Sequence, residues 1–272
     1  PFVVGYIGVL VAKRIGVPVQ VQIHTDYTNN AFIFESARHM IEFAISFVVL
    51  RFASCVRVVS ESGARSVRRY TNAPVSVLPI SIDTAPLISP RERPPEFGTR
   101  KNIVTVSRLT KEKNINLVIR ALKHVEGADL FVVGDGPLRK SLQRTARSLQ
   151  LAERVHFLGW RDDVAPYFQH ADCFVQASSY EGYGLSLMNA VIAGTPSVST
   201  SVGVATDLPH ELVTLVQKDE YAIARAIRTT FHQDSEARER RLSARTGFLR
   251  SLPDEALYAK TYISLIATCG SS

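Results

Sequence analysis

The sequence is poor in the residues that define several protein classes. Its 272 residues include three cysteines, Cys55, Cys173 and Cys269, which are odd in number and far apart. We therefore expect a reducing compartment, with neither a disulfide framework nor a zinc site. Uncharged apolar runs such as 43–50 are too short to span a bilayer. No basic segment opens the chain, so no secretory signal is predicted, and we expect a cytoplasmic protein.

The chain begins with Pro1 and no initiator Met, in the middle of a pattern. We expect that the opening part of a first domain is missing from this sequence. What is present is 46% hydrophobic and 21% charged, which is typical of a globular protein. The length fits one large or two ordinary domains. The net charge of +7 is compatible with nucleic acid, an anionic membrane or anionic small molecules.

The stretch 180–196 predicts a turn, a short helix and a stop. Gly182 and Gly184 flank Tyr183, so the backbone can turn tightly there and approach a ligand closely. An apolar run starts at Leu185 and ends in a Gly-Thr-Pro stop. A glycine turn that opens a helix leaves free N–H groups at the positive end of the helix dipole. Those groups favour a phosphate.

Glu181 lies beside this predicted phosphate site. A carboxylate next to a phosphate is unfavourable unless it has another task, such as accepting hydrogen bonds from hydroxyl groups. Phosphate and hydroxyl recognition together indicate a sugar phosphate or a nucleotide sugar. A glycine-rich turn with a surface Glu explains the same residues equally well.

From residue 99 on, strand patterns alternate with helix patterns, which predicts a parallel sheet with right-handed crossovers. The expected strands are 103–107, 130–133, 155–158, 172–176 and 197–200. The Pro-rich and charged segment 84–101 is the only convincing linker, so we place a domain boundary near residue 98.

The first 98 residues alternate in the same way. We expect helices over 5–16 and 31–54, strands over 19–23, 55–60 and 75–78, and a helix capped by Ser60. His24 follows the first strand, at the end where ligands bind in α/β sheets, although a lone His is more often structural than catalytic. Six Arg and two Glu lie between Arg38 and Arg69. They indicate either a solvated helix face or a basic patch for anionic lipid or a lipid-linked acceptor.

Several motifs together resemble the retaining GT-B glycosyltransferases of family 4, which includes sucrose-synthase-like and phosphatidylinositol-mannosyltransferase-like enzymes. The first motif is Glu-Gly-Tyr-Gly-Leu-Ser-Leu at 181–187, followed by Ala-Gly-Thr-Pro-Ser-Val at 193–198. The others are Ser-Arg-Leu at 107–109 with Glu-Lys at 112–113, and Gly-Asp-Gly-Pro at 134–137. The resemblance is specific over 103–210 and looser before residue 80.

The resemblance implies an α/β protein of GT-B type, with two Rossmann-like domains facing across a cleft and the first domain truncated. It implies an incomplete acceptor-side domain with linker at 1–98, a nucleotide-sugar domain at 99–254, and a final helix at 255–272 that crosses back. It also implies transfer of a hexosyl group from a nucleotide-diphosphate sugar to a glycan, lipid-linked or small-molecule acceptor, with anomeric retention. No metal, cofactor or nucleic acid is expected. Contact with anionic membrane would place the protein on the inner face of the membrane.

The resemblance gives individual residues expected roles. Arg108 and Lys113 would hold the donor diphosphate, as a planar fork and a compact charge. Glu181 would bind sugar hydroxyls, and His24 would lie by the reacting sugar. The family usually carries a second Glu eight positions after the first, where this chain has Asn189. The other expected donor-binding residues are Ser107, Gly134, Gly136, Gly159, Gly182, Tyr183, Gly184, Leu185 and Asn189.

Two alternatives stay open at this point. One is a sugar-nucleotide 2-epimerase of the same fold, against which the order Arg108, Lys113, Glu181 speaks. The other is a non-catalytic nucleotide-sugar-binding fragment.

Overall fold

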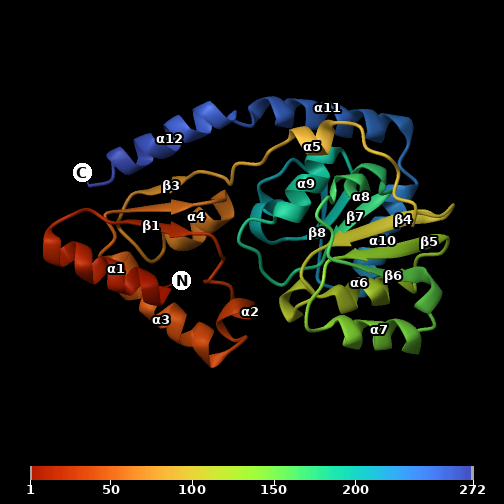
Figure 1. Ribbon diagram of the computed structural model, residues 1–272, viewed down its shortest axis with the longest axis horizontal. Coiled ribbons are helices and arrows are strands. Elements are labelled where there is room, and N and C mark those ends of the chain that lie inside the picture. The colour runs from red at the N-terminus through yellow and green to blue at the C-terminus, as the bar shows by residue number, and fades with distance from the viewer. Residues whose placement is uncertain (1, 271–272) are drawn as a thin grey trace. The chain divides into compact units, whose positions relative to one another are not determined.

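The structure is a computed structural model that describes residues 2–270 (Figure 1). The described residues form two compact units. The N-terminal unit contains residues 2–82, 180–183 and 252–270, and the C-terminal unit contains 83–179 and 184–251.

The N-terminal unit is built on a parallel sheet with the strand order β1-β2-β3. Its core gathers apolar residues from strands and helices, including Val9, Val49, Leu50 and Val56. Helix α1 lies against α3, and a Cβ added at Gly5 would meet Val49 at 3.4 Å. The elements are α1 (Phe2–Ile15), β1 (Gln20–Ile23), α2 (Asn30–Ile33), α3 (Ala37–Arg51), β2 (Cys55–Val58), α4 (Glu61–Val67), β3 (Val75–Val77) and α12 (Glu255–Ala267).

The long helix expected over 31–54 is wrong, because the structure divides it into α2 and α3. Asn29 caps α2 by accepting a hydrogen bond from the Ala31 N–H at 2.8 Å. Ser36 adopts an extended backbone and caps α3 by accepting from the His39 N–H. Two competing N-caps therefore interrupt a segment that is otherwise helical in pattern. The cap expected at Ser60 is present, since its hydroxyl accepts from the Gly63 N–H.

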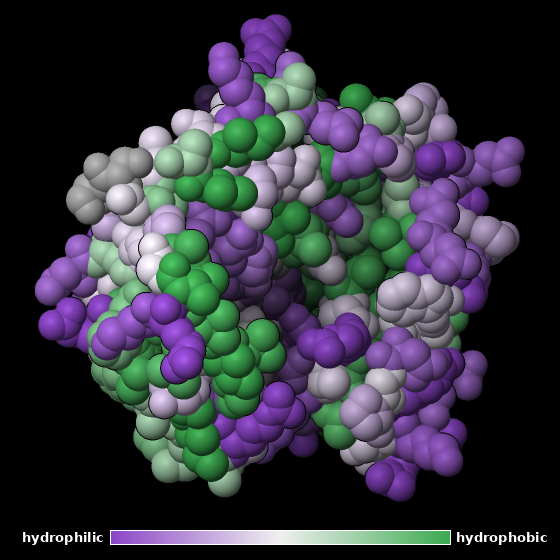
Figure 2. All heavy atoms as spheres, turned by 60° about the vertical axis from the view of Figure 1, so that its left-hand side comes forward, coloured by the Kyte–Doolittle hydropathy of each residue, from purple (hydrophilic) through white to green (hydrophobic). Residues whose placement is uncertain are grey.

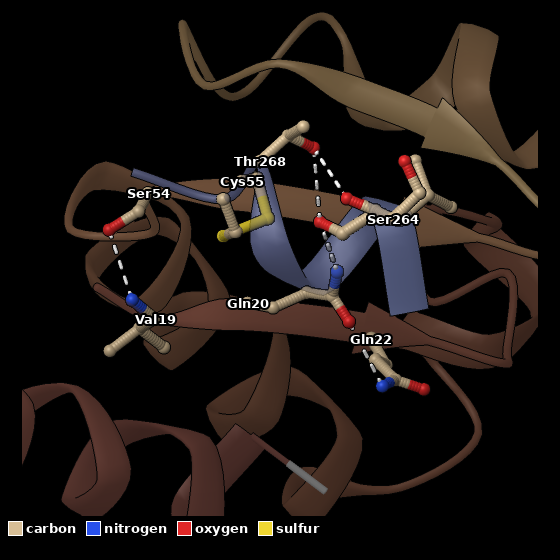
Figure 3. Close-up of a disulfide and its surroundings, with 9 residues drawn as sticks. Val19, Gln20, Gln22, Ser54, Cys55, Ser264 and Thr268 are labelled. Carbon is tan, nitrogen blue, oxygen red and sulfur yellow. Dashed lines mark hydrogen bonds between the residues drawn. A yellow bond between two sulfur atoms is a disulfide. The ribbon is translucent and has the colours of Figure 1, made fainter. Parts of the chain in front are cut away.

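The cysteines correct another expectation, because Cys55 and Cys269 form a disulfide (Figure 3). Their separation of 214 residues joins β2 to the segment that follows α12. Figure 3 shows the disulfide between the β1–β2 sheet and α12, beside Gln20, whose amide donates to the Leu265 carbonyl. Sequence spacing could not reveal this pair, because the two thiols meet only in the folded unit. Cys173 is a buried free thiol.

The C-terminal unit holds a parallel sheet of six strands among the described residues, in the order β6-β5-β4-β7-β8-β9. The strands are β4 (Lys101–Val106), β5 (Ala128–Val133), β6 (Val155–Gly159), β7 (Cys173–Gln176), β8 (Ser197–Thr200) and β9 (Val213–Val216). The helices are α5 (Ala85–Ile88), α6 (Ile115–Leu122), α7 (Arg139–Ser148), α8 (Ala165–His170), α9 (Leu185–Ala193), α10 (Glu220–Phe231) and α11 (Ser235–Ser251). Short 3-10 turns occur at Lys111–Lys113, Ala152–Arg154 and Gly203–Thr206.

The residues that appeared to be a linker are structured and belong to the C-terminal unit. Phe97 and Leu87 are buried, and Phe97 packs on Phe131 with 4.5 Å between ring centroids. The Gln169 amide donates to the carbonyls of Leu87 and Ser89. The units therefore divide between Ile82 and Asp83, before the boundary expected near residue 98.

Candidate functional site

The C-terminal sheet has a topological switch point between β4 and β7. From β4 the chain builds outward to β5 and β6, and from β7 it builds in the other direction to β8 and β9. Loops that leave the carboxyl ends of two such strands diverge and leave a crevice, where α/β proteins bind their ligands. Here these loops are residues 107–114, after β4, and the segment after β7 that leads to Ser179.

Asn114 ties these two loops together. Its backbone is left-handed, with φ of 49°, and its amide donates to the Ala177 carbonyl at 3.0 Å and to the Ser179 hydroxyl at 2.7 Å. The Ser179 N–H in turn donates to the Glu112 carbonyl at 2.7 Å. The end of the loop after β4 is thus fixed through Glu112 and Asn114. Asn tolerates this conformation better than most side chains, which is the one signal of its role in the sequence.

Arg108 and Lys113, the two residues predicted to bind phosphate, lie on this loop after β4. The Arg108 side chain is 75% exposed, and its Nη2 lies 3.8 Å from the Glu112 carboxylate. Glu112 also accepts a hydrogen bond from the Thr110 hydroxyl at 2.6 Å. Lys113 is half-buried at the end of the 3-10 turn. A third cation, Lys218, donates to the Ser179 hydroxyl at 3.1 Å from the loop after β9, a position that no local sequence pattern predicts.

Glycines allow the loops after β4 and β5 to touch through their backbones. A Cβ at Gly134 would lie 2.0 Å from the Ser107 carbonyl oxygen, and one at Gly136 would lie 2.7 Å from the Leu109 backbone. Gly134 also has a φ of 124°, which disfavours other residues. The Leu109 N–H donates to the Asp135 carbonyl at 2.9 Å. Ser107 leaves its buried hydroxyl without a hydrogen-bond partner in the described chain.

Gly159 continues this backbone cluster at the end of β6. Its carbonyl accepts from the Gly134 N–H at 2.7 Å, and its φ is 74°. A Cβ there would meet the Arg139 guanidinium at 3.2 Å. Arg139 bridges the Asp135 carboxylate and the Phe157 carbonyl, so it braces the predicted glycine loop from α7.

The start of α9 is as the sequence predicts. Gly184 precedes the helix with a φ of 100°, and no side chain caps the first turn. The first N–H groups of this nine-residue helix are therefore open to an anion. Leu185 is exposed, and Asn189 lies one turn further along the same helix.

The remaining predicted residues lie in the N-terminal unit, where β1 ends. Gly182 packs so closely on the His24 carbonyl that an added Cβ would clash with its oxygen. The Glu181 carbonyl accepts from the Asp26 N–H at 3.4 Å, and Tyr183 is buried. The structure thus brings His24, Glu181 and Gly182 together. The chain passes into the C-terminal unit between Tyr183 and Gly184.

Arg57 belongs to the Arg-rich stretch between Arg38 and Arg69, but it is a buried cation near His24 and not part of a basic surface. It donates to Gln22, to the Leu78 and Pro79 carbonyls, and to the Tyr258 hydroxyl at 2.8 Å. Partial burial lowers the pKa of His24, and the positive charge of Arg57 lowers it further. The imidazole is consequently held in its neutral form near pH 7.

The described residues contain no group of three or more His, Cys, Asp or Glu side chains placed to hold a metal ion. Over the same residues, no helix is both long and apolar enough to cross a bilayer.

Comparison with known proteins identifies the family of this chain. The profile named glycosyl transferases group 1 matches residues 89–246, which is more than half of the chain. The chain belongs to this family. It is 32% identical over 143 residues to the lipopolysaccharide core biosynthesis glycosyltransferase LpsE of Rhizobium meliloti, covering 52% of this chain and 40% of that protein. It is 27% identical over 218 residues to the alpha-monoglucosyldiacylglycerol synthase of Streptococcus pneumoniae, covering 73% and 49%.

Solved structures share the fold at low identity. HepE of Anabaena, crystallised with UDP, matches with a TM-score of 0.81 at 18% identity, over 98% of this chain and 77% of that one. Sucrose-phosphate synthase of Thermosynechococcus elongatus matches with a TM-score of 0.84 at 21% identity, over 98% and 72%. The expected α/β fold with parallel sheets of GT-B type is confirmed. The chain spans less than half the length of the curated relatives it matches first.

Proposed function

We propose that this chain transfers a hexosyl group from a nucleotide-diphosphate sugar to an acceptor with retention of anomeric configuration. The observations that carry the proposal are the loop at the β4–β7 switch point, which Asn114 fixes and which carries Arg108 and Lys113, and the uncapped start of α9 in the same unit. A leaving nucleoside diphosphate gains negative charge in the transition state. Cations and helix N–H groups that are already fixed there lower the barrier.

We assign the diphosphate to Arg108 and Lys113 and to the first N–H groups of α9. Arg108 has an exposed guanidinium whose nearest carboxylate, on Glu112, lies 3.8 Å away, so its fork remains accessible to phosphate oxygens. These groups neutralise the diphosphate without a metal ion. Activity that persists in excess EDTA would agree with this assignment, and activity that returns only with Mg²⁺ or Mn²⁺ would contradict it.

Glu181 accepts hydrogen bonds from the hydroxyls of the transferred sugar, and a neutral His24 acts beside the reacting carbon. No residue of the site is assigned as the general base. The leaving phosphate removes the acceptor proton on the same face of the sugar, which gives retention. Replacing His24 with Ala would therefore lower turnover more than donor affinity. Equal turnover in the His24→Ala variant would leave this residue with a structural role only.

The acceptor is a glycan or a lipid-linked sugar of the cell envelope. This proposal rests on the names of two relatives, one a lipopolysaccharide core glycosyltransferase and the other a monoglucosyldiacylglycerol synthase. We propose no role for nucleic acid.

One experiment separates transfer from epimerisation at the sugar C2, the other reaction that the fold supports. The chain is incubated with UDP-glucose, UDP-N-acetylglucosamine and their GDP counterparts, and the products are followed by ¹H and ³¹P NMR. Transfer releases the free nucleoside diphosphate and forms an α-linked product with an acceptor, or the free sugar with water. Appearance of a 2-epimer with the nucleotide still attached would instead establish the epimerase.

A hydrophobic face on α1 and α3 supports peripheral contact with an anionic membrane on its cytoplasmic side. Figure 2 shows hydrophobic side chains at its lower left, the region of α1 and α3 in Figure 1. Basic residues border this face at the ends of both helices. Apolar side chains enter the interface while basic ones bind anionic headgroups. The exposed apolar residues include Val3, Val4, Tyr6, Ile7, Leu10, Val11 and Ile15 on α1, and Met40, Ile41, Phe47 and Val48 on α3.

Liposome sedimentation tests this contact. We expect the chain to sediment with phosphatidylglycerol vesicles more than with phosphatidylcholine vesicles, and Ile7→Glu/Ile41→Glu to release it. Leu242→Glu on α11, where Leu242 is 44% exposed, is the matched control and should sediment like the parent. No preference for anionic vesicles would remove the membrane from the proposal.

A further inference from the structure

A second cavity lies in the C-terminal unit at the amino ends of its strands. Its volume is about 300 Å³, and it is lined by Lys101, which begins β4, by Asp172 before β7 and by Pro196 before β8. All strands of this sheet are parallel, so this cavity lies at the edge opposite the loops that follow β4 and β7. The nine residues of α9 separate Gly194, on the cavity wall, from Gly184 by about 14 Å.

Helix α11 supplies two guanidinium groups to this cavity, Arg238 and Arg241. Arg241 is half-buried, donates to the Gln233 amide oxygen at 2.6 Å, and leaves its buried Nε without a hydrogen-bond partner in the described chain. Burial lowers the pKa of Arg241, and the charge of the neighbouring Arg238 lowers it further. A half-buried guanidinium beside a second cation is costly unless an anion joins them.

The acidic group of the cavity does not serve as that anion. Asp172 is occupied, because one carboxylate oxygen accepts from Lys101 Nζ at 2.8 Å and the other from the Asn102 N–H at 2.8 Å. Lys101 and Asp172 therefore neutralise each other, and the two arginines leave the cavity with a net positive charge. The carboxyl end of α9 is covered as well, since Arg245 donates to the Ile192 carbonyl.

The other walls suit hydroxyl groups. Thr195 and Thr230 are buried, and their hydroxyls donate to the carbonyls of Phe168 and Ala226. Their oxygens can still accept hydrogen bonds from a ligand. The volume falls at the lower end of the range for small-molecule sites, which suits a sugar-sized molecule with one anionic group.

We propose that this cavity binds a small phosphate monoester, with the phosphate on Arg238 and Arg241 and the hydroxyls of the ligand toward Thr195 and Thr230. The guanidinium fork matches a phosphate in geometry as well as in charge. The site is separate from the proposed donor site and does not depend on the transferase activity.

Isothermal titration calorimetry of the full chain tests the proposal, with inorganic phosphate and glucose 6-phosphate as probes and glucose as the neutral control. The Arg108→Ala/Lys113→Ala variant is the background for every titration, because the proposed donor site also attracts phosphate. We expect both anions to bind this variant, and glucose 6-phosphate to bind more tightly than inorganic phosphate. Glucose should not bind. Absence of binding by both anions would overturn the proposal.

Charge-removing variants on α11 assign the binding to the cavity. Arg238→Gln and Arg241→Gln should each lower the affinity for glucose 6-phosphate by about tenfold or more, which is the effect of losing one charge-assisted hydrogen bond. Arg250→Gln removes the same charge from the last turn of α11, outside the cavity, and should bind like the background. If Arg241→Gln fails to fold, Arg238→Gln, whose side chain is exposed, decides the question. Equal affinity in Arg238→Gln and Arg250→Gln would overturn the proposal.

Discussion

Among single residues, Asn189 departs from the family pattern most directly. It follows Leu185 by one turn of α9, where the resemblance implies a Glu that binds the ribose hydroxyls. Asn keeps one acceptor oxygen but loses the charge and one methylene. We expect Asn189→Glu to tighten donor binding by about 1–2 kcal/mol, since a charged acceptor is about twice as strong as a neutral one.

Calorimetry with the preferred donor and its 2′-deoxy and 3′-deoxy analogues measures this effect. Asn189→Asp is the matched control, because it restores the charge without the added reach. Should all three donors bind the parent and Asn189→Glu equally well, Asn189 does not contact the ribose.

His24 gives a prediction of pH dependence. Its pKa lies below the ordinary value of 6.5 because of burial and the charge of Arg57. Well above pH 6.5 the ring is neutral in both the folded and the unfolded chain. As the pH falls below that value the unfolded chain takes up the proton first, so stability falls until the pH has passed the folded pKa.

NMR titration of the His24 ring measures its pKa directly. We expect a midpoint below 6.5, and a higher midpoint in Arg57→Gln, which removes the charge. Arg57→Lys keeps the charge and should keep the low midpoint. A midpoint that is the same in Arg57→Gln and in the parent would show that Arg57 does not act on the ring.

At the scale of elements, glycines at loop contacts and glycines in open helix positions should respond differently to replacement by Ala. Gly134→Ala places a Cβ 2.0 Å from the Ser107 carbonyl oxygen in a backbone with a φ of 124°. We expect it to cost at least about 1–3 kcal/mol in the free energy of unfolding and to weaken donor binding. Gly247→Ala in α11 meets nothing within 4 Å and should be neutral or stabilising by up to about 1 kcal/mol. Urea unfolding measures the free energy of unfolding of both variants. Equal values for Gly134→Ala and Gly247→Ala would show that the close contact between the loops after β4 and β5 does not contribute to stability.

The sequence predicted most elements because their signals are local. Alternating apolar residues located β1, and Ser60 and Gly184 located the starts of α4 and α9. It missed β9, because two of the four residues of this edge strand are exposed and the pattern is short. It also misread the residues before β4 as a linker, because their partners, such as Gln169, are distant in sequence.

The residues of the candidate site also fall into two groups, those that local sequence patterns predict and those that depend on the order of the strands. The glycines at 134, 136 and 184 are visible in sequence because special backbone geometry demands them. The bracing by Asn114 and the position of Lys218 depend on the order of β4, β7 and β9 in the sheet. No local pattern encodes that order.

At the scale of the whole molecule, the disulfide closes a loop between residues 214 positions apart. Cross-linking a long loop restricts the unfolded chain, typically by about 2–4 kcal/mol. We expect Cys55→Ser/Cys269→Ser to lower the free energy of unfolding by about that amount. Dithiothreitol should lower the melting temperature of the parent but not of this variant.

Thiol counting supplies the control for this prediction. Burial raises the pKa of Cys173 to about 12, so it should react with a maleimide only after unfolding. The native parent should therefore show no reactive thiol before reduction. If two thiols of the native, unreduced parent react with the maleimide, Cys55 and Cys269 are not joined.

The central claim is that the loop after β4 holds the diphosphate of a nucleotide sugar. Calorimetric titration of the chain with UDP, GDP, ADP, CDP and dTDP tests it most directly, in the parent and in Arg108→Ala, Lys113→Ala and Lys111→Ala. Lys111 lies in the same 3-10 turn and is exposed, which makes it the matched control. The account predicts that at least one diphosphate binds with one-to-one stoichiometry. Its affinity should fall about tenfold or more in Arg108→Ala and in Lys113→Ala, and stay unchanged in Lys111→Ala. Binding of no diphosphate, or equal binding by all three variants and the parent, would contradict it.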